Sequence, residues 1–216
     1  MRTVVIGGYG NFGTRICRAL CADPDTQVIA VGRTPDPARF GPQIQSAKID
    51  LSSPDFAADL KRLSPDVVIH CGGPFQAQDY RVAKASIGAG AHYIDLADGR
   101  AFVNGFPQEM NSLARDSGLL MISGASTVPA LSSAVVDELR TRFGQIEEIK
   151  IYIAPGQRAP RGTATIAGVF SYAGKPMKWM RDGQWSNAWG WQELARVDIV
   201  GLGKRWAAAC DIPDLD

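Results

Sequence analysis

Short apolar runs recur along the first 123 residues, and segments with helical spacing lie between them. The runs are short and almost continuously hydrophobic, as strands covered by helices on both faces are. Strands that alternate with helices predict βαβ units and a mainly parallel sheet. We expect the strands to be 2–7, 27–32, 46–50, 66–71, 92–96 and 118–123.

The segments between these strands place apolar residues on one face of a helix. In 11–22, the residues Phe12, Ile16, Ala19 and Leu20 recur at helical spacing. The same spacing predicts helices over 54–63, 79–89 and 101–117. An α/β fold with a Rossmann-type, doubly wound parallel sheet follows from this order of elements.

The pattern changes after Ser123. We expect a helix from about 129 to 142, and 146–155 then alternates as a half-buried strand would. Thr163 is expected to cap a further short helix and Gly174 to end it.

All five tryptophans lie beyond that helix, so we expect the last segment to pack as a second layer or an interface. We therefore divide the chain into a Rossmann-type domain, 1–123, and part of a second domain, 124–216. The second α/β domain is expected to be incomplete, and a homodimer is expected to form through it.

The charge balance limits the classes of partner. The 216 residues carry 23 Lys and Arg against 22 Asp and Glu, so the formal net charge of +1 gives no field that attracts nucleic acid. No apolar run approaches the roughly 18 residues that span a bilayer, and the N-terminus does not resemble a signal peptide. We expect a cytoplasmic protein without a nucleic-acid or membrane partner.

Few residues suggest a metal site or a redox pair. We expect Cys17, Cys21, Cys71 and Cys210 to be buried thiols, because their spacing shows no paired framework. The two histidines, His70 and His92, lie in predicted strands without metal-ligand spacing, so structural roles are expected for them. No metal site is predicted.

A glycine motif follows the first strand. Gly8, Gly10 and Gly13 fit G-x-G-x-x-G between a predicted strand and a predicted helix, which is typical of a dinucleotide site. We expect Gly8 to make the tight turn, Gly10 to let the backbone approach a pyrophosphate, and Gly13 to allow close packing of the helix. The helix N-terminus at Asn11 and Phe12 would offer N–H groups to the phosphates.

The end of the second strand indicates which nicotinamide cofactor is bound. An NAD site usually has a carboxylate there, whereas this chain has Arg33, followed by Thr34. A guanidinium can pair with a 2′-phosphate, so NADP is favoured and NAD is less expected. The alternative is that Arg33 is simply a solvated residue at a strand end.

Two later strand ends belong to the same predicted crevice. Asp50 would accept a hydrogen bond from the adenine amino group, or it would cap the helix that follows. Gly72, Gly73 and Pro74 would let the backbone pass close to the nicotinamide ribose.

The chain resembles the saccharopine dehydrogenase-like (saccharopine reductase-like) NADP-binding oxidoreductases. The likeness is carried by VIGGYGNFG (5–13), VVIHCGGPF (67–75), HYIDLADG (92–99) and GASTVPALSSAVVDEL (124–139). The resemblance implies an N-terminal Rossmann domain, a longer second domain that binds substrate and mediates dimerisation, and hydride transfer at a carbon–nitrogen or carbonyl bond. The chain is shorter than the usual family member.

Hydride transfer also needs a proton donor or a charge stabiliser beside the nicotinamide. Asp98 is the first candidate and Tyr80 the second, while Asp98 would otherwise cap the turn with Gly99. We thus expect an NADP-dependent oxidoreductase that acts on a small amino-acid-like imine or carbonyl substrate. The alternative is a catalytically silent dinucleotide-binding sensor or scaffold, because fold alone does not settle function.

Overall fold

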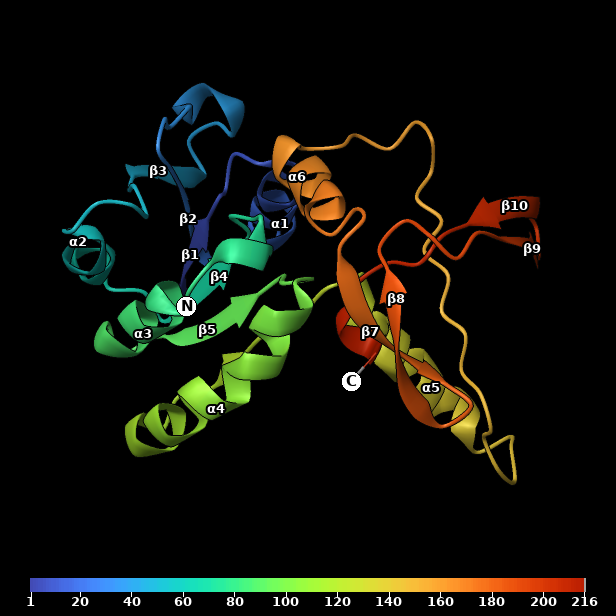
Figure 1. Cartoon of the computed structure of the whole chain (residues 1–216). Helices are drawn as coiled ribbons and strands as arrows, with labels where there is room; N and C mark the ends of the chain where they lie inside the picture. The colour runs from blue at the N-terminus through green and yellow to red at the C-terminus, as the bar shows by residue number, and fades with distance from the viewer. Residues whose placement is uncertain (216) are drawn as a thin grey trace.

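The computed structural model describes residues 1–215 and contains a six-stranded parallel sheet in the order β3-β2-β1-β4-β5-β6 (Figure 1). The central strand β1 pairs in parallel with β2 on one side and with β4 on the other. The strand order reverses there, and doubly wound sheets bind ligands at this switch point. The predicted Rossmann-type fold is confirmed. The strands are β1 (Arg2–Ile6), β2 (Gln27–Gly32), β3 (Ile44–Lys48), β4 (Val67–His70), β5 (His92–Asp95) and β6 (Met121–Ile122).

The largest differences from the predicted strands lie at the two edges of this sheet. The strand predicted at 46–50 begins at Ile44, and the one predicted at 118–123 is reduced to Met121–Ile122. The inner strands differ from their predicted bounds by at most one residue at either end. An edge strand has one hydrogen-bonded neighbour, so its ends are less strongly fixed by ladder pairing.

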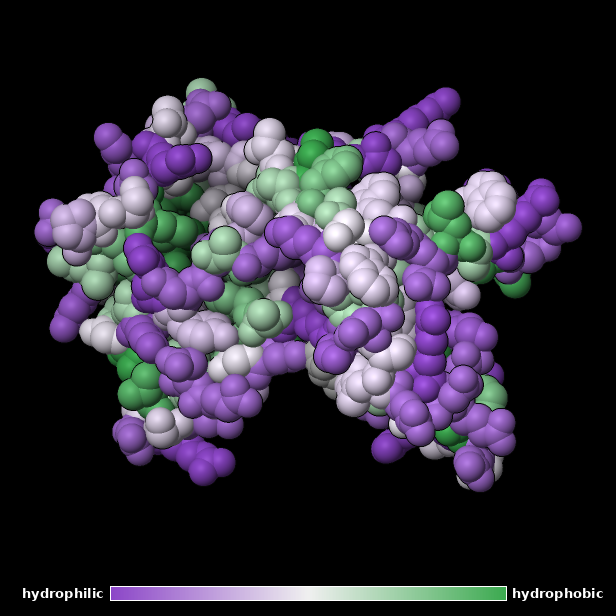
Figure 2. All heavy atoms as spheres, viewed as in Figure 1, coloured by the Kyte–Doolittle hydropathy of each residue, from purple (hydrophilic) through white to green (hydrophobic). Residues whose placement is uncertain are grey.

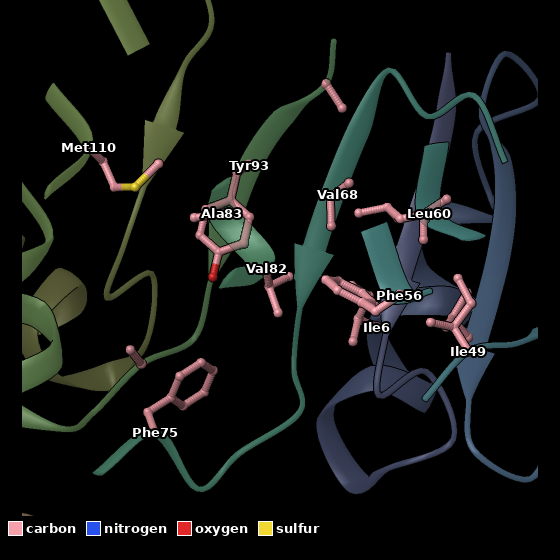
Figure 3. Packing of buried hydrophobic residues seen from close by; sticks show 14 of the residues in the cluster. Ile6, Ile49, Phe56, Leu60, Val68, Phe75, Val82, Ala83, Tyr93 and Met110 are labelled. Atoms are coloured by element: carbon pink, nitrogen blue, oxygen red, sulfur yellow. The ribbon is translucent and has the colours of Figure 1, made fainter. Parts of the chain in front are cut away.

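Helices cover both faces of β1, because successive side chains of a strand point to opposite faces. Val4 and Ile6 belong to the large core cluster beneath α2, α3 and α4, whereas Val5 packs with Cys17 of α1 on the other face. Figure 3 shows part of the large cluster, in which Phe56 of α2 lies beside Ile6. The helices of this region are α1 (Asn11–Leu20), α2 (Phe56–Arg62), α3 (Arg81–Gly88) and α4 (Arg100–Ser117), with short 3-10 turns η1 (Pro37–Arg39) and η2 (Phe75–Ala77).

The rest of the chain forms small elements beside this domain (Figure 1). Two separate antiparallel hairpins, β7–β8 and β9–β10, replace any large second sheet among the described residues. The turn of the first hairpin, Asp182–Gly183, has positive φ at both positions, as a type I′ turn requires. The elements are η3 (Thr127–Leu131), α5 (Ser132–Arg140), α6 (Thr163–Ser171), β7 (Pro176–Arg181), β8 (Gln184–Trp189), β9 (Ala195–Ile199), β10 (Gly203–Ala207) and η4 (Pro213–Leu215).

Two local predictions for this part of the chain are wrong. The strand predicted at 146–155 is absent, because this segment runs over the surface without a partner strand to supply a hydrogen-bonded ladder. The helix predicted from about 129 to 142 is present as the helical turn η3 followed directly by α5, which ends at Arg140. The N-cap of α6 is Gly162 rather than Thr163, although Gly174 does follow the helix with a positive φ of 66°.

Polar contacts near α4 connect the two parts of the chain. Arg100, at the start of α4, donates to the Lys178 carbonyl of β7 at 2.6 Å, pairs with Asp211 at 3.4 Å, and lies over the ring of Trp185. Ser132 donates to the Asp214 carboxylate at 2.9 Å. The second part is therefore attached to the carboxyl-end edge of the sheet by side chains near α4 and the chain end.

Candidate functional site

The turn between β1 and α1 is shaped by close backbone approaches. Gly7 has a φ of +74°, and a Cβ on it would lie 3.0 Å from the Gly72 nitrogen in the loop after β4. A Cβ on Gly13 would run into the Gly7 carbonyl oxygen and lie 2.7 Å from the Gly8 Cα. The turn therefore brings the ends of β1 and β4 and the start of α1 together, and a side chain at these glycines would force them apart.

The structural roles of the glycines differ from the predicted ones. The left-handed residue that makes the tight turn is Gly7, not Gly8. Gly8 instead lies against β2, where a Cβ would come within 2.9 Å of the Ala30 Cβ. Gly10 donates its N–H to the Gly7 carbonyl at 2.9 Å and precedes α1 as its N-cap. Sequence reasoning missed Gly7, because the G-x-G-x-x-G pattern can be fitted without it.

The N-terminus of α1 faces this turn. No side chain caps it, so the predicted phosphate-binding N–H groups of Asn11 and Phe12 have no capping acceptor from a side chain. The Asn11 amide donates to the Pro160 carbonyl at 3.0 Å, which brings the segment before α6 over the start of α1. The Phe12 side chain is half exposed.

The ends of β2 and β3 place charged groups near one another. Arg33 and Thr34, which follow β2, are exposed. Hydrogen bonds from Ser52 lower the pKa of Asp50, and the positive charges of Arg33 and Lys48 lower it further. Asp50 accepts from the Ser52 N–H at 2.9 Å and from its hydroxyl at 2.7 Å. The carboxylate therefore fixes the turn after β3, and its contact with adenine stays a prediction.

Hydrogen bonds with His70 and Gln78 hold the loop after β4 in place. The Gly72 N–H donates to His70 Nδ1 at 3.3 Å, and His70 Nε2 lies 3.0 Å from the Gln78 amide oxygen. The Gln78 amide nitrogen donates to the carbonyls of Gly72 at 2.7 Å and Pro74 at 2.9 Å. Burial lowers the pKa of His70, which favours the neutral ring. The predicted Gly72–Gly73–Pro74 loop thus has supports that the sequence did not reveal.

Asp98 follows β5 and lies beside this loop. Its carboxylate accepts a hydrogen bond from the Gln76 amide of η2 at 3.2 Å. The side chain is exposed at the surface, yet protein atoms on its sides desolvate the carboxyl group and raise its pKa. The Gln76 amide oxygen is buried and has no hydrogen-bond partner among residues 1–215. Asp98 therefore stands at the crevice edge as a carboxyl group that holds a proton more readily than usual.

Tyr80, the other predicted proton donor, lies elsewhere. Its hydroxyl donates to the Phe102 carbonyl at 3.0 Å, and its ring packs against Phe102 and Phe106 of α4. Burial is the main cause that raises its pKa. These contacts place Tyr80 in the packing between α3 and α4 and not with Asp98.

A second aspartate organises the end of β5. Asp95 is fully buried and accepts hydrogen bonds from the Tyr93 hydroxyl, the Ala97 and Gly124 N–H groups, and the Ser123 hydroxyl. With four donors, this carboxylate joins β5 to the loop after β6. It positions the segment that contains Asp98.

Helix α6 covers part of the crevice edge. It lies against η2, where a Cβ on Gly73 would come within 3.8 Å of Ala164 and one on Gly168 within 3.1 Å of the Gln76 oxygen (Figure 1). Apolar residues gather over α6 in Figure 2, and Ile166 and Phe170 are exposed there. The substrate side of the predicted site is therefore bounded by a helix from the second part of the chain.

A protein-family model matches the first part of this chain. The model described as "Saccharopine dehydrogenase NADP binding domain" matches residues 3–122. The chain belongs to this family. The match covers all six strands of the parallel sheet, and the resemblance predicted from the four sequence stretches is confirmed. Its NAD(P)-binding domain is thus that of a dehydrogenase family.

One solved structure supports this fold. Apo histidine-tagged saccharopine dehydrogenase (L-Glu forming) from Saccharomyces cerevisiae aligns with a TM-score of 0.62 and 14% identity, over 92% of this chain and 47% of the yeast chain. The WlbA dehydrogenase from Thermus thermophilus, in complex with NAD and alpha-ketoglutarate, aligns with a TM-score of 0.49 and 15% identity, over 67% of this chain and 48% of the other. No curated protein matches the sequence. The chain thus spans about half the length of the yeast enzyme.

Residues 1–215 provide neither a metal-binding cluster nor a membrane-spanning helix. Within this range no group of His, Cys, Asp or Glu side chains is arranged to hold a metal ion. None of the helices there combines the length and apolar character needed to cross a bilayer. The four cysteines are free, and burial raises the pKa of Cys17 and Cys71 to about 12.

Proposed function

We propose that this protein is an NADP-dependent oxidoreductase of the saccharopine dehydrogenase type. The observation that carries the proposal is the glycine turn, which opens onto the uncapped N-terminus of α1 at the switch point between β1 and β4. Arg33, in place of a carboxylate after β2, supports NADP over NAD.

Each part of the crevice has a role in this proposal. Backbone N–H groups of Asn11 and Phe12 hold the pyrophosphate, which the glycine turn lets approach the backbone, and Arg33 with Thr34 holds the 2′-phosphate. Asp50 faces the adenine, and the loop from Gly72 to Pro74 faces the nicotinamide ribose. The nicotinamide supplies the hydride when the cofactor is bound.

Asp98 is the proposed proton-transfer group. A raised pKa lets a carboxyl group carry a proton closer to neutral pH, so it can protonate the nitrogen or oxygen of a substrate whose carbon receives the hydride. The hydroxyl of Tyr80 is already engaged with Phe102, so Asp98 alone is retained in this role. The family and the name of the yeast enzyme support a small amino-acid-like imine or carbonyl substrate.

Cofactor preference is the direct test. Titration followed by fluorescence should show tighter binding of NADPH than of NADH. Arg33→Ala should remove about tenfold or more of that preference, because a charge-assisted hydrogen bond contributes about 1.5–3 kcal/mol. Arg115→Ala, at an exposed position on α4, is the matched control. Equal affinities of the wild type for both dinucleotides would refute the NADP assignment.

A catalytically silent dinucleotide sensor or scaffold is the second candidate. It is favoured by the engagement of the Tyr80 hydroxyl with the Phe102 carbonyl, which leaves Asp98 as the one retained candidate for proton transfer, and fold alone does not determine activity. Oxidation of NADPH in the presence of a panel of amino-acid semialdehydes and amines separates the two. Turnover supports the enzyme, whereas NADPH binding without turnover supports the sensor.

We also propose a cytoplasmic homodimer that associates through the second part of the chain. Reduced, free cysteines are typical of a cytoplasmic protein. Exposed apolar side chains on α5 and at its two ends, Leu131, Val135, Leu139 and Phe143, support self-association. Light scattering should give a mass of about twice 23.2 kDa, and a monomeric mass at high concentration would contradict the dimer.

A further inference from the structure

The loop after β4 is tied to a partly buried glutamine and a buried histidine by a set of hydrogen bonds that we call the Gln78 clamp. It consists of His70, Gln78 and the backbone of Gly72 and Pro74. Every distance in it is between 2.7 and 3.3 Å. The clamp spans the whole turn from the last residue of β4 to the start of α3.

The orientation of each group in the clamp is determined by its partner. The Gly72 N–H can only donate, so His70 Nδ1 must accept and the proton of the neutral ring lies on Nε2. Nε2 therefore donates to the Gln78 oxygen, and the Gln78 amide nitrogen must point at the two carbonyls. Reversing the amide would place an oxygen against two carbonyl oxygens.

The clamp acts on the residues that border the proposed dinucleotide crevice. The Gly72 nitrogen is 3.0 Å from where a Cβ of Gly7 would be, so the loop contacts the glycine turn itself. With the carbonyls of Gly72 and Pro74 engaged by Gln78, the Gly73 carbonyl between them accepts no hydrogen bond from any residue in 1–215. The loop thus retains one carbonyl for a donor from outside the chain, such as a ribose hydroxyl.

We propose that Gln78 is a positioning residue for the dinucleotide. It holds the Gly72–Gly73–Pro74 loop in the shape that lets the Gly73 carbonyl meet the ligand. Gln78 acts through the loop backbone, so it contributes to affinity for the cofactor by reducing the order that the loop must gain on binding. This inference rests on the proposed binding of NADP.

Two substitutions test the clamp at constant side-chain size. Gln78→Met keeps the length and removes all three hydrogen bonds of the side chain. Gln78→Glu is isosteric but places an acceptor against the two carbonyls, so it should be the more damaging at neutral pH. Gln45→Met, at an exposed position on β3, is the matched control.

The measurement is the NADPH dissociation constant, taken at a temperature where circular dichroism shows every variant to be fully folded. We expect Gln78→Met to raise it on the order of tenfold, Gln78→Glu to raise it further, and Gln45→Met to leave it unchanged. Nitrogen NMR of His70 in the wild type should show the proton on Nε2.

Failure of this inference is distinguishable from failure of the proposed function. If the wild type does not bind NADPH, the proposed function fails. If the wild type binds and both Gln78 variants bind as Gln45→Met does, the clamp is structural only and the inference is overturned, even if their thermal stability is lower. A wild-type His70 with its proton on Nδ1 would also overturn it.

Discussion

The two parts of the chain bury their apolar residues very differently. Residues 2–122 form a core in which side chains such as Leu60, Val68 and Tyr93 are fully buried between sheet and helices (Figure 3). Beyond residue 124 a small core cluster consists of Met177, Ala188 and Ala209. Helix α5 has no buried residue at all.

Because of this difference, we expect the first part of the chain to determine the stability of the fold and the second part to contribute to substrate recognition. The parallel sheet has enough buried surface to hold the glycine turn and the loop after β4 in fixed positions. The second part contributes α6 and the chain end to the crevice edge but contains little core of its own. We therefore expect cofactor binding to depend on the parallel sheet. We expect the second part of the chain to affect mainly the substrate side of the site.

The largest expected contrast in stability is between two leucines. Leu60→Ala removes a fully buried side chain of α2 and should lower the free energy of unfolding by about 2–5 kcal/mol. Leu194→Ala, in the second part of the chain, removes a side chain that is 69% exposed and should change it by less than about 0.5 kcal/mol. Urea unfolding followed by circular dichroism measures both.

Tryptophan fluorescence sharpens this comparison, because all five tryptophans lie in the second part of the chain. If the two parts unfold together, both probes should report the same loss for Leu60→Ala. Similar losses for the two leucine variants would contradict the assignment of the stabilising core to residues 2–122.

A smaller effect is expected from the glycine turn. Gly13→Ala places a methyl group against the Gly7 carbonyl and Gly8, so it should cost about 1–3 kcal/mol of stability and weaken NADPH binding. Gly88→Ala in α3 is the control, because an added Cβ meets nothing within 4 Å. It should leave stability unchanged or raise it by up to about 1 kcal/mol. Thermal unfolding and NADPH titration of both variants provide the test. Normal binding by Gly13→Ala would contradict the proposed binding of the pyrophosphate at the glycine turn.

The sequence predicts the sheet well because the inner strands carry their own signal. The run at 27–32 is apolar enough to specify a buried strand without knowledge of its neighbours, and the structure has it at the same residues. The alternation at 146–155 is just as regular, but a strand exists only where another strand pairs with it. The Asp182–Gly183 pair is a local hairpin signal that the sequence does contain, and the structure has its turn at these residues.

The sequence predicts only those parts of the crevice that depend on backbone geometry and strand order. Glycines that fit a dinucleotide motif can be found from spacing, and the positions after each strand follow from the topology. Gln78 and Asp95 could not be found this way, because their roles depend on which loop atoms a folded side chain can reach. The packing of Tyr80 against α4 is likewise a tertiary contact that its position after β4 does not reveal.

We expect the smallest effect from mild acid, acting on His70. Burial lowers the pKa of this residue in the folded protein from its ordinary value of 6.5, with Gln78 and Asp95 opposing the shift. The unfolded chain then binds more protons just below pH 6.5, so the stability from the neutral ring is complete above that pH and is lost as the pH falls below it. Hydrogen bonds also lower the pKa values of Asp50 and Asp79, but from 3.8, so they act in a separate, more acidic range. Urea unfolding between pH 7 and 5 should show this loss in the wild type and a flatter profile in His70→Gln, and identical slopes would show that His70 does not titrate as inferred.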